Sequence, residues 1–102
     1  MNNKENYAVR VQKDIEDLIP VFMSNRRKEI ETLRLALASA DFEQLRQLGH
    51  RMRGVGNSYG FERISEIGKE IEDGASAGDR AGIASCITEY SHYISNVRIS
   101  YE

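Results

Sequence analysis

The sequence predicts an all-α protein, an antiparallel up-down-up-down four-helix bundle with a short N-terminal lead-in. Apolar residues recur at helical spacing along almost all of the 102 residues, and Pro20 is the only proline. Four amphipathic segments separated by short connections favour antiparallel neighbours in a bundle. No strand pattern competes with this interpretation. We therefore expect a single domain over residues 1–102, with the lead-in at 1–13 and the bundle at about 14–102.

The beginning of the first helix depends on Asp14 and Pro20. The lead-in is predicted as irregular or extended, and Asp14 as the N-cap of a helix that continues to about Ala38. Pro20 falls in the second turn, where it either kinks this helix or marks a later start. The apolar positions of this helix are Ile15, Leu18, Ile19, Phe22, Met23, Ile30, Leu33 and Leu37.

Three further helices follow, at about 42–57, at about 61–77 and after Gly78. Asp41 and Gln44 resemble a capping box at the start of the second helix, and Asp79 is a fresh N-cap for the fourth. The second helix has its core stripe at Phe42, Leu45, Leu48, Met52 and Val55. The third places Phe61, Ile64, Ile67, Gly68, Ile71 and Ala75 inward. The fourth carries Ile83, Ile87, Tyr90, Ile94, Val97 and Tyr101.

Composition excludes several classes of partner. The formal net charge is −2, with acids and bases interspersed, so neither nucleic acid nor a membrane is an expected partner. The short basic run Arg26–Lys28 is followed by Glu29 and Glu31, which favours a solvated helix face. No apolar run is long enough to cross a bilayer, and the polar N-terminus lacks the apolar region of a signal peptide. We expect a cytoplasmic monomer.

The single cysteine, Cys86, cannot form an internal disulfide. No Cys/His cluster offers a zinc site, so no metal and no cofactor are predicted within the chain.

The most unusual stretch is GHRMRGVGNSYGF, residues 49–61, which holds four of the eight glycines. Glycine inside a helix costs about 1 kcal/mol relative to alanine, so the cluster needs a reason. At about 100° per residue, His50 lies roughly opposite the core stripe of the second helix, and Gly54 follows one turn later. A bare strip of backbone beside an exposed imidazole would let another surface approach the ring. Gly60 is predicted to form the turn into the third helix.

His92, the second histidine, is an internal comparison. It also projects away from its helix's apolar stripe, but its neighbours include no glycine and no basic residue one turn away. We therefore interpret His92 as an ordinary surface residue. An exposed histidine alone would receive the same interpretation, so His50 is distinguished by its neighbours.

A neutral imidazole nitrogen is a good nucleophile toward phosphorus, and a cation one turn away would offset the charge of the phosphoryl group. The residues HRMRGVGNSYGF resemble the signature of the histidine-containing phosphotransfer (HPt) family, His-x-x-Lys/Arg-Gly followed six residues later by glycine. His50, Arg53, Gly54 and Gly60 fill these positions, and Phe61 is the usual apolar residue after the last glycine. The resemblance covers most of the chain. Arg53 stands where the family usually has Lys, which keeps the charge and adds a bidentate fork for phosphate oxygens.

The resemblance implies that His50 attacks an aspartyl phosphate held by a receiver domain, which would supply Mg²⁺. It further implies a Gln or Glu on the following helix that hydrogen-bonds the other ring nitrogen. Here that residue is Glu72, which an antiparallel hairpin brings level with His50, and it would fix the ring tautomer and make the ring more basic. Asn57 and Lys69 are weaker candidates for the rim of the phosphate site.

The leading interpretation is a stoichiometric phosphocarrier that accepts a phosphoryl group on His50 from a receiver aspartate and passes it to another receiver. Its partners would be response-regulator receivers, a hybrid histidine kinase, or both. One alternative is the phosphoacceptor domain of a larger histidine kinase, with the same site and another donor. The other is a non-phosphorylated helical scaffold, against which the intact His-x-x-Arg-Gly argues. The chain is not expected to be an enzyme, because no nucleotide-binding box fits within it.

Overall fold

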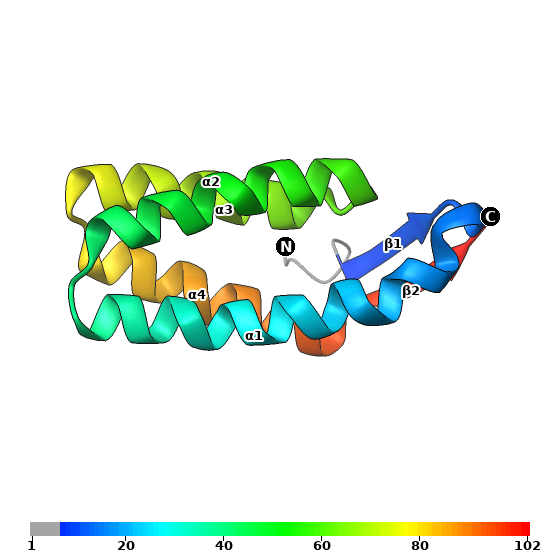
Figure 1. Cartoon of the computed structure of the whole chain (residues 1–102), viewed down its shortest axis with the longest axis horizontal. Coiled ribbons are helices and arrows are strands. Elements are labelled where there is room, and N and C mark those ends of the chain that lie inside the picture. The colour runs from blue at the N-terminus through cyan, green and yellow to red at the C-terminus, as the bar shows by residue number, and fades with distance from the viewer. Residues whose placement is uncertain (1–6) are drawn as a thin grey trace.

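Four helices pack along one another in the computed structural model, which describes residues 7–102 (Figure 1). They are α1 (Ile19–Ala38), α2 (Phe42–Tyr59), α3 (Glu62–Ala77) and α4 (Arg80–Asn96). In Figure 1 the chain reverses at each connection, and α2 and α3 lie above α1 and α4. The helical class is confirmed, while residues 1–6 of the predicted lead-in lie outside the described residues.

The start of the first helix differs from the prediction. Lys13–Leu18 form a 3₁₀-helix, and α1 begins at Ile19 with Pro20 in its first turn. Proline fits there because first-turn N–H groups have no acceptor within the helix and the ring presets φ. Pro20 therefore marks a later start, and Asp14 lies within the 3₁₀-helix instead of capping α1. Consequently Leu18, predicted as a core position, is 52% exposed.

Two aspartates begin helices as predicted. The Asp41 carboxylate accepts a hydrogen bond from the Gln44 N–H at 3.1 Å, and α2 follows at once. The Asp79 carboxylate accepts one from the Gly82 N–H at 3.0 Å at the start of α4. Each bond satisfies one of the N–H groups that a helix start leaves without a partner.

Glycines end α2 and α3. Gly60 has a φ of 86° and Gly78 a φ of 68°, the left-handed conformation that glycine adopts without a side-chain penalty. α2 continues to Tyr59, slightly beyond its predicted end.

Two short strands are present, although no strand pattern competes with the helical spacing in the sequence. β1 (Ala8–Val11) and β2 (Arg98–Tyr101) form a parallel pair, with Ala8 opposite Arg98 and Val11 opposite Tyr101. Figure 1 shows the pair beyond one end of the bundle. The lead-in is therefore extended at β1, as one of its two predicted forms.

The prediction that the fourth helix includes Val97 and Tyr101 is wrong. α4 ends at Asn96, and Val97 is already extended at a ψ of 136°. The reason is tertiary, since β2 hydrogen-bonds to a strand from the other end of the chain. The Lys13 N–H donates to the Glu102 carbonyl at 2.8 Å, which lengthens the pairing.

The core lies between the helices and is lined by side chains from all four. Most predicted inward positions are buried, among them Phe22, Leu33, Leu45, Met52, Ile64, Ile67, Ile71, Ile83 and Tyr90. Tyr93 is also fully buried, although the predicted stripe of the fourth helix omits it.

Glycines bring α2 and α3 into backbone contact. A Cβ on Gly49 would lie 2.6 Å from the Gly68 carbonyl oxygen, and one on Gly56 would lie 2.5 Å from Ser65 Oγ. Larger residues would force the two helices apart. These glycines therefore permit the close packing that sets the positions of the side chains above the α2–α3 groove.

Candidate functional site

His50 stands on the outer face of α2 as the helical wheel predicts. Its side chain is 69% exposed. One turn further on, a Cβ on Gly54 would have no atom within 4 Å. The imidazole therefore lies beside open space, where a second molecule can approach the ring.

Glu72 on α3 lies across the groove from His50. The Glu72 Oε2 to His50 Nδ1 distance is 3.3 Å, just longer than a typical N–H···O bond. Glu72 is far less exposed than the histidine, with 17% of its side chain accessible. The contact links the carboxylate to Nδ1 and leaves Nε2 as the other ring nitrogen.

Arg53 binds the same carboxylate. Its Nη1 donates to Glu72 Oε1 at 2.8 Å, so Glu72 bridges the predicted nucleophile and the predicted cation. The Arg53 side chain remains 44% exposed. The hydrogen bond from Arg53 is the largest influence on the pKa of Glu72, and it lowers this pKa. Desolvation acts in the opposite direction, and His50 adds a smaller lowering effect. Glu72 is therefore a carboxylate at neutral pH.

Contacts from α3 to the backbone of Arg53 also hold this arrangement in place. The Gly68 backbone approaches α2 so closely that a Cβ there would lie 2.9 Å from the Arg53 backbone nitrogen. The Ser65 hydroxyl donates to the Arg53 carbonyl at 2.7 Å. Ser65 was not predicted as a site residue. The hairpin register that aligns Glu72 with His50 makes Ser65 level with Asn57 and next to Gly56, so it indicates that Ser65 faces α2. It does not indicate the hydrogen bond to the Arg53 carbonyl, which lies one turn earlier on α2.

The two weaker rim candidates have other surroundings. The Lys69 ammonium pairs with Asp73 Oδ2 at 2.9 Å along α3. Asn57 is exposed near the end of α2 and lines a cavity with Gly60. Among the interactions found in residues 7–102, neither residue contacts His50.

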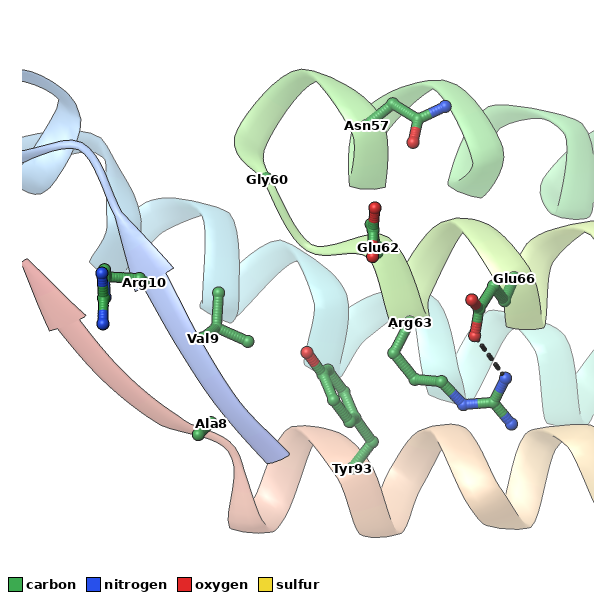
Figure 2. Close-up of a pocket in the computed structure, with 9 residues that line it drawn as sticks. All are labelled: Ala8, Val9, Arg10, Asn57, Gly60, Glu62, Arg63, Glu66 and Tyr93. Atoms are coloured by element: carbon green, nitrogen blue, oxygen red, sulfur yellow. Dashed lines mark hydrogen bonds and ion pairs between the residues drawn. The ribbon is translucent and has the colours of Figure 1, made fainter. Parts of the chain in front are cut away.

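That cavity lies apart from His50. It has a volume of about 460 Å³ between β1, the α2–α3 turn and α4 (Figure 2). Figure 2 shows Arg10 and Val9 on the strand side, Arg63 paired with Glu66 on α3, and Tyr93 rising from α4. None of His50, Arg53 and Glu72 lines it. The histidine site is a surface site.

His92 and Cys86 remain outside the site. His92 is exposed, its carbonyl accepts from Asn96 Nδ2 at 2.8 Å, and its ring meets Tyr7 edge-on. Burial is the main cause that raises the pKa of the Cys86 thiol to about 11, which makes it a poor nucleophile.

Between residues 7 and 102, no group of three or more His, Cys, Asp or Glu side chains is placed to hold a metal ion. In the same range, no helix has the length and apolar character needed to span a membrane.

The arrangement suits one reaction type. An exposed imidazole with a carboxylate at Nδ1 and a guanidinium close by can act as a nucleophile toward an electrophile that approaches from solvent. The guanidinium can offset negative charge that is delivered to the ring.

Comparison with known protein families agrees with this chemistry. The model of the Hpt domain matches residues 17–99, which includes all four helices and the three site residues. No curated protein and no solved structure gave a significant match. Hpt domains are phosphocarriers rather than enzymes, and they exchange phosphoryl groups with receiver domains and kinases in phosphorelays. The chain belongs to the Hpt domain family.

Proposed function

We propose that His50 is the phosphorylated residue of this Hpt domain, which accepts a phosphoryl group from a receiver aspartate and passes it to another receiver. The observation that carries the proposal is the pairing of the exposed His50 ring with Glu72 through Nδ1 at 3.3 Å. His92 has no carboxylate partner of this kind among the ion pairs of residues 7–102.

The transfer requires little from this chain. Glu72 accepts a hydrogen bond from the protonated Nδ1, which leaves the lone pair on Nε2. Nε2 attacks the phosphorus of the aspartyl phosphate, and the bond between phosphorus and the carboxylate oxygen breaks, so the receiver regains its carboxylate. The receiver would supply Mg²⁺ and most of the charge stabilisation. The domain acts as a stoichiometric carrier.

Arg53 and Gly54 have separate proposed roles. Arg53 holds positive charge within reach of the ring, and Gly54 leaves space for the receiver. The open surroundings of Gly54 support this role, because a Cβ there would meet no atom within 4 Å.

The test is incubation with a panel of phosphorylated receiver domains, scored for acid-labile label on this chain. His50→Gln is expected to abolish labelling, and the matched variant His92→Gln is expected to leave it unchanged. Label that persists in His50→Gln, or that is lost in His92→Gln alone, would contradict the assignment. Labelling by a histidine kinase but by no receiver would favour the kinase-domain alternative.

A further inference from the structure

The outer edge of β2 has the properties of an interface with a second copy of the same strand. We propose that two copies of this chain associate through this edge, with their β2 strands antiparallel and a two-fold axis at Ser100. The two strand pairs would then form one continuous sheet. This inference goes beyond the proposed function and does not depend on His50. It differs from the monomer that the sequence led us to expect.

β2 lies on the outside of the strand pair. Its one strand neighbour in the described part of the chain is β1. In Figure 2, β1 lies between β2 and the α2–α3 turn, and the cavity there is lined by residues 8–10 of β1 and by no described residue of β2. Arg98, Ser100 and Tyr101 are exposed. The edge of β2 that faces away from β1 is therefore open, and an open strand edge is a surface to which a further strand can add.

The ladder between β1 and β2 determines which backbone groups are free. Glu102 directs both of its groups at β1, because its N–H donates to the Val11 carbonyl at 3.1 Å and its carbonyl accepts from the Lys13 N–H at 2.8 Å. Along a strand, successive residues direct their N–H and C=O groups to opposite edges. The groups of Ile99 and Tyr101 therefore point away from β1, toward the open edge. They are available to hydrogen-bond an added strand.

One antiparallel register suits these free groups and the charges together. With Ser100 opposite Ser100 of the second copy, Ile99 lies opposite Tyr101 of the second copy, and the two residues exchange both hydrogen bonds. A shift by one residue would set these free groups against groups that already bond to β1. A shift by two residues in either direction would place Ser100 opposite Arg98 or Glu102, so that these two charged residues would no longer face each other.

Side chains that face each other in this register are complementary. Arg98 lies opposite Glu102 of the second copy, and the two-fold axis repeats this pair. Opposite charges directly across antiparallel strands stabilise their pairing, as do pairs of an aromatic and a β-branched residue such as Tyr101 and Ile99. Arg98 forms no ion pair within residues 7–102, and Glu102 has one exposed contact, with Arg10 at 3.5 Å. Both charged groups can therefore turn to the second copy.

The equivalent edge of β1 lacks this complementarity. Its free backbone groups belong to Ala8 and Arg10, because the Val11 carbonyl bonds to β2 and the direction alternates along the strand. Arg10 is the one charged residue of β1, so antiparallel pairing of β1 with itself brings no acid opposite a base. This edge also faces the cavity beside the α2–α3 turn. The second copy is therefore assigned to β2.

The first experiment measures association of the 102-residue chain by sedimentation velocity. So small an interface should give a weak dimer, with a dissociation constant on the order of 100 μM. Arg98→Glu and Glu102→Arg should each raise this constant about tenfold, because each sets like charges opposite one another. An equimolar mixture of the two variants should recover the wild-type value, as should a chain that carries both substitutions.

Three outcomes would overturn the inference. The first is a wild-type chain that stays monomeric up to about 1 mM. The second is a dimer that neither charge reversal weakens, and the third is a loss that the mixture does not recover. His50→Gln should dimerise like wild type, so this result is separate from the labelling test of the proposed function.

A second experiment locates the two-fold axis. Opposed residues of a non-hydrogen-bonded antiparallel pair have Cα atoms about 4.5 Å apart, which is within the range of a disulfide. Ser100→Cys, in a Cys86→Ser background, should therefore form a disulfide-linked dimer under mild oxidation. Ala8→Cys in the same background places an exposed thiol on β1 as the matched control, and it should cross-link about tenfold more slowly. Equal or faster cross-linking through Ala8→Cys would assign the contact to another surface and reject the β2 interface.

Discussion

Gly49 of α2 and Gly68 of α3 meet backbone to backbone, so closely that a Cβ on Gly49 would lie 2.6 Å from the Gly68 carbonyl oxygen. The same Cβ would lie 2.7 Å from the Glu72 backbone nitrogen. The close approach of the two helices thus determines where the Glu72 carboxylate lies relative to the ring of His50. Within the motif, Gly49 permits this close packing, whereas Gly54 leaves open space beside the ring.

Gly49→Ala is expected to destabilise the domain by about 1–3 kcal/mol, because its methyl group meets backbone atoms that cannot move without separating the helices. Gly54→Ala on the same helix is expected to stabilise it by up to about 1 kcal/mol, because the position is open and alanine has the better helix propensity. Denaturant unfolding of both variants tests this. Equal effects of the two substitutions would show that the close packing does not constrain α2.

Gly54→Gln should separate stability from function. The side chain has room at this position, so the variant should fold as well as wild type. It should nevertheless obstruct a receiver and slow transfer from an aspartyl phosphate, while labelling by phosphoramidate suffers less. Melting temperature and both transfer rates are measured on one protein. Receiver transfer at the wild-type rate would exclude Gly54 from the docking surface.

Arg53→Ala is expected to slow phosphoryl transfer, and Arg53→Lys to preserve most of it, because charge matters more than the guanidinium fork at an open site.

Arg53→Ala should also raise the pKa of Glu72 toward its ordinary value, since the Arg53 hydrogen bond is the main cause of the lowered pKa. The lowered pKa of Glu72 contributes folding stability at pH values above the pKa of Glu72 in the unfolded chain. This contribution is lost as pH falls through the pKa of Glu72 in the folded protein. In Arg53→Ala this contribution to stability should shrink. NMR titration of the Glu72 side chain measures the pKa, and an unchanged value would contradict the pairing.

Replacement of Glu72 should depend on the substituent. Glu72→Gln retains an oxygen that can accept a hydrogen bond from Nδ1–H, so initial phosphorylation near neutral pH should be slowed less than in Glu72→Ala. Rates of labelling from one phosphorylated receiver compare the two. Equal rates in both variants would mean that the acceptor oxygen does not orient the ring.

Two buried tyrosines on α4 offer a prediction about stability. The Tyr90 hydroxyl donates to Glu29 Oε1 at 2.6 Å, whereas the Tyr93 hydroxyl has no hydrogen-bond partner among residues 7–102. Tyr90→Phe should therefore cost about 1.5–3 kcal/mol, the range for hydrogen bonds to charged groups. Tyr93→Phe should be neutral or stabilising. Chemical denaturation checks both, and a larger loss in Tyr93→Phe would reverse the assignment.

Local features of the sequence determined most of the helical structure. The spacing of apolar residues predicted four helices, and Asp41, Asp79, Gly60 and Gly78 marked their ends through hydrogen bonds and dihedral angles formed within a few residues. The exposure of His50 followed from the same periodicity, because a helix fixes the direction of each side chain. Pro20 is a local signal for the start of α1, but proline in this context is compatible with either a kink or a helix start.

Tertiary structure decided the features that join distant segments. The end of α4 and the strand at Arg98–Tyr101 depend on pairing with Ala8–Val11, from the opposite end of the chain, which no local pattern records. The hairpin register brought Glu72 level with His50, but the sequence did not reveal that Arg53 binds the same carboxylate. That contact depends on how closely α2 and α3 approach and on the reach of two long side chains. Helical periodicity gives directions around an axis, whereas the distance between two helices is set by the atoms that meet at their contact.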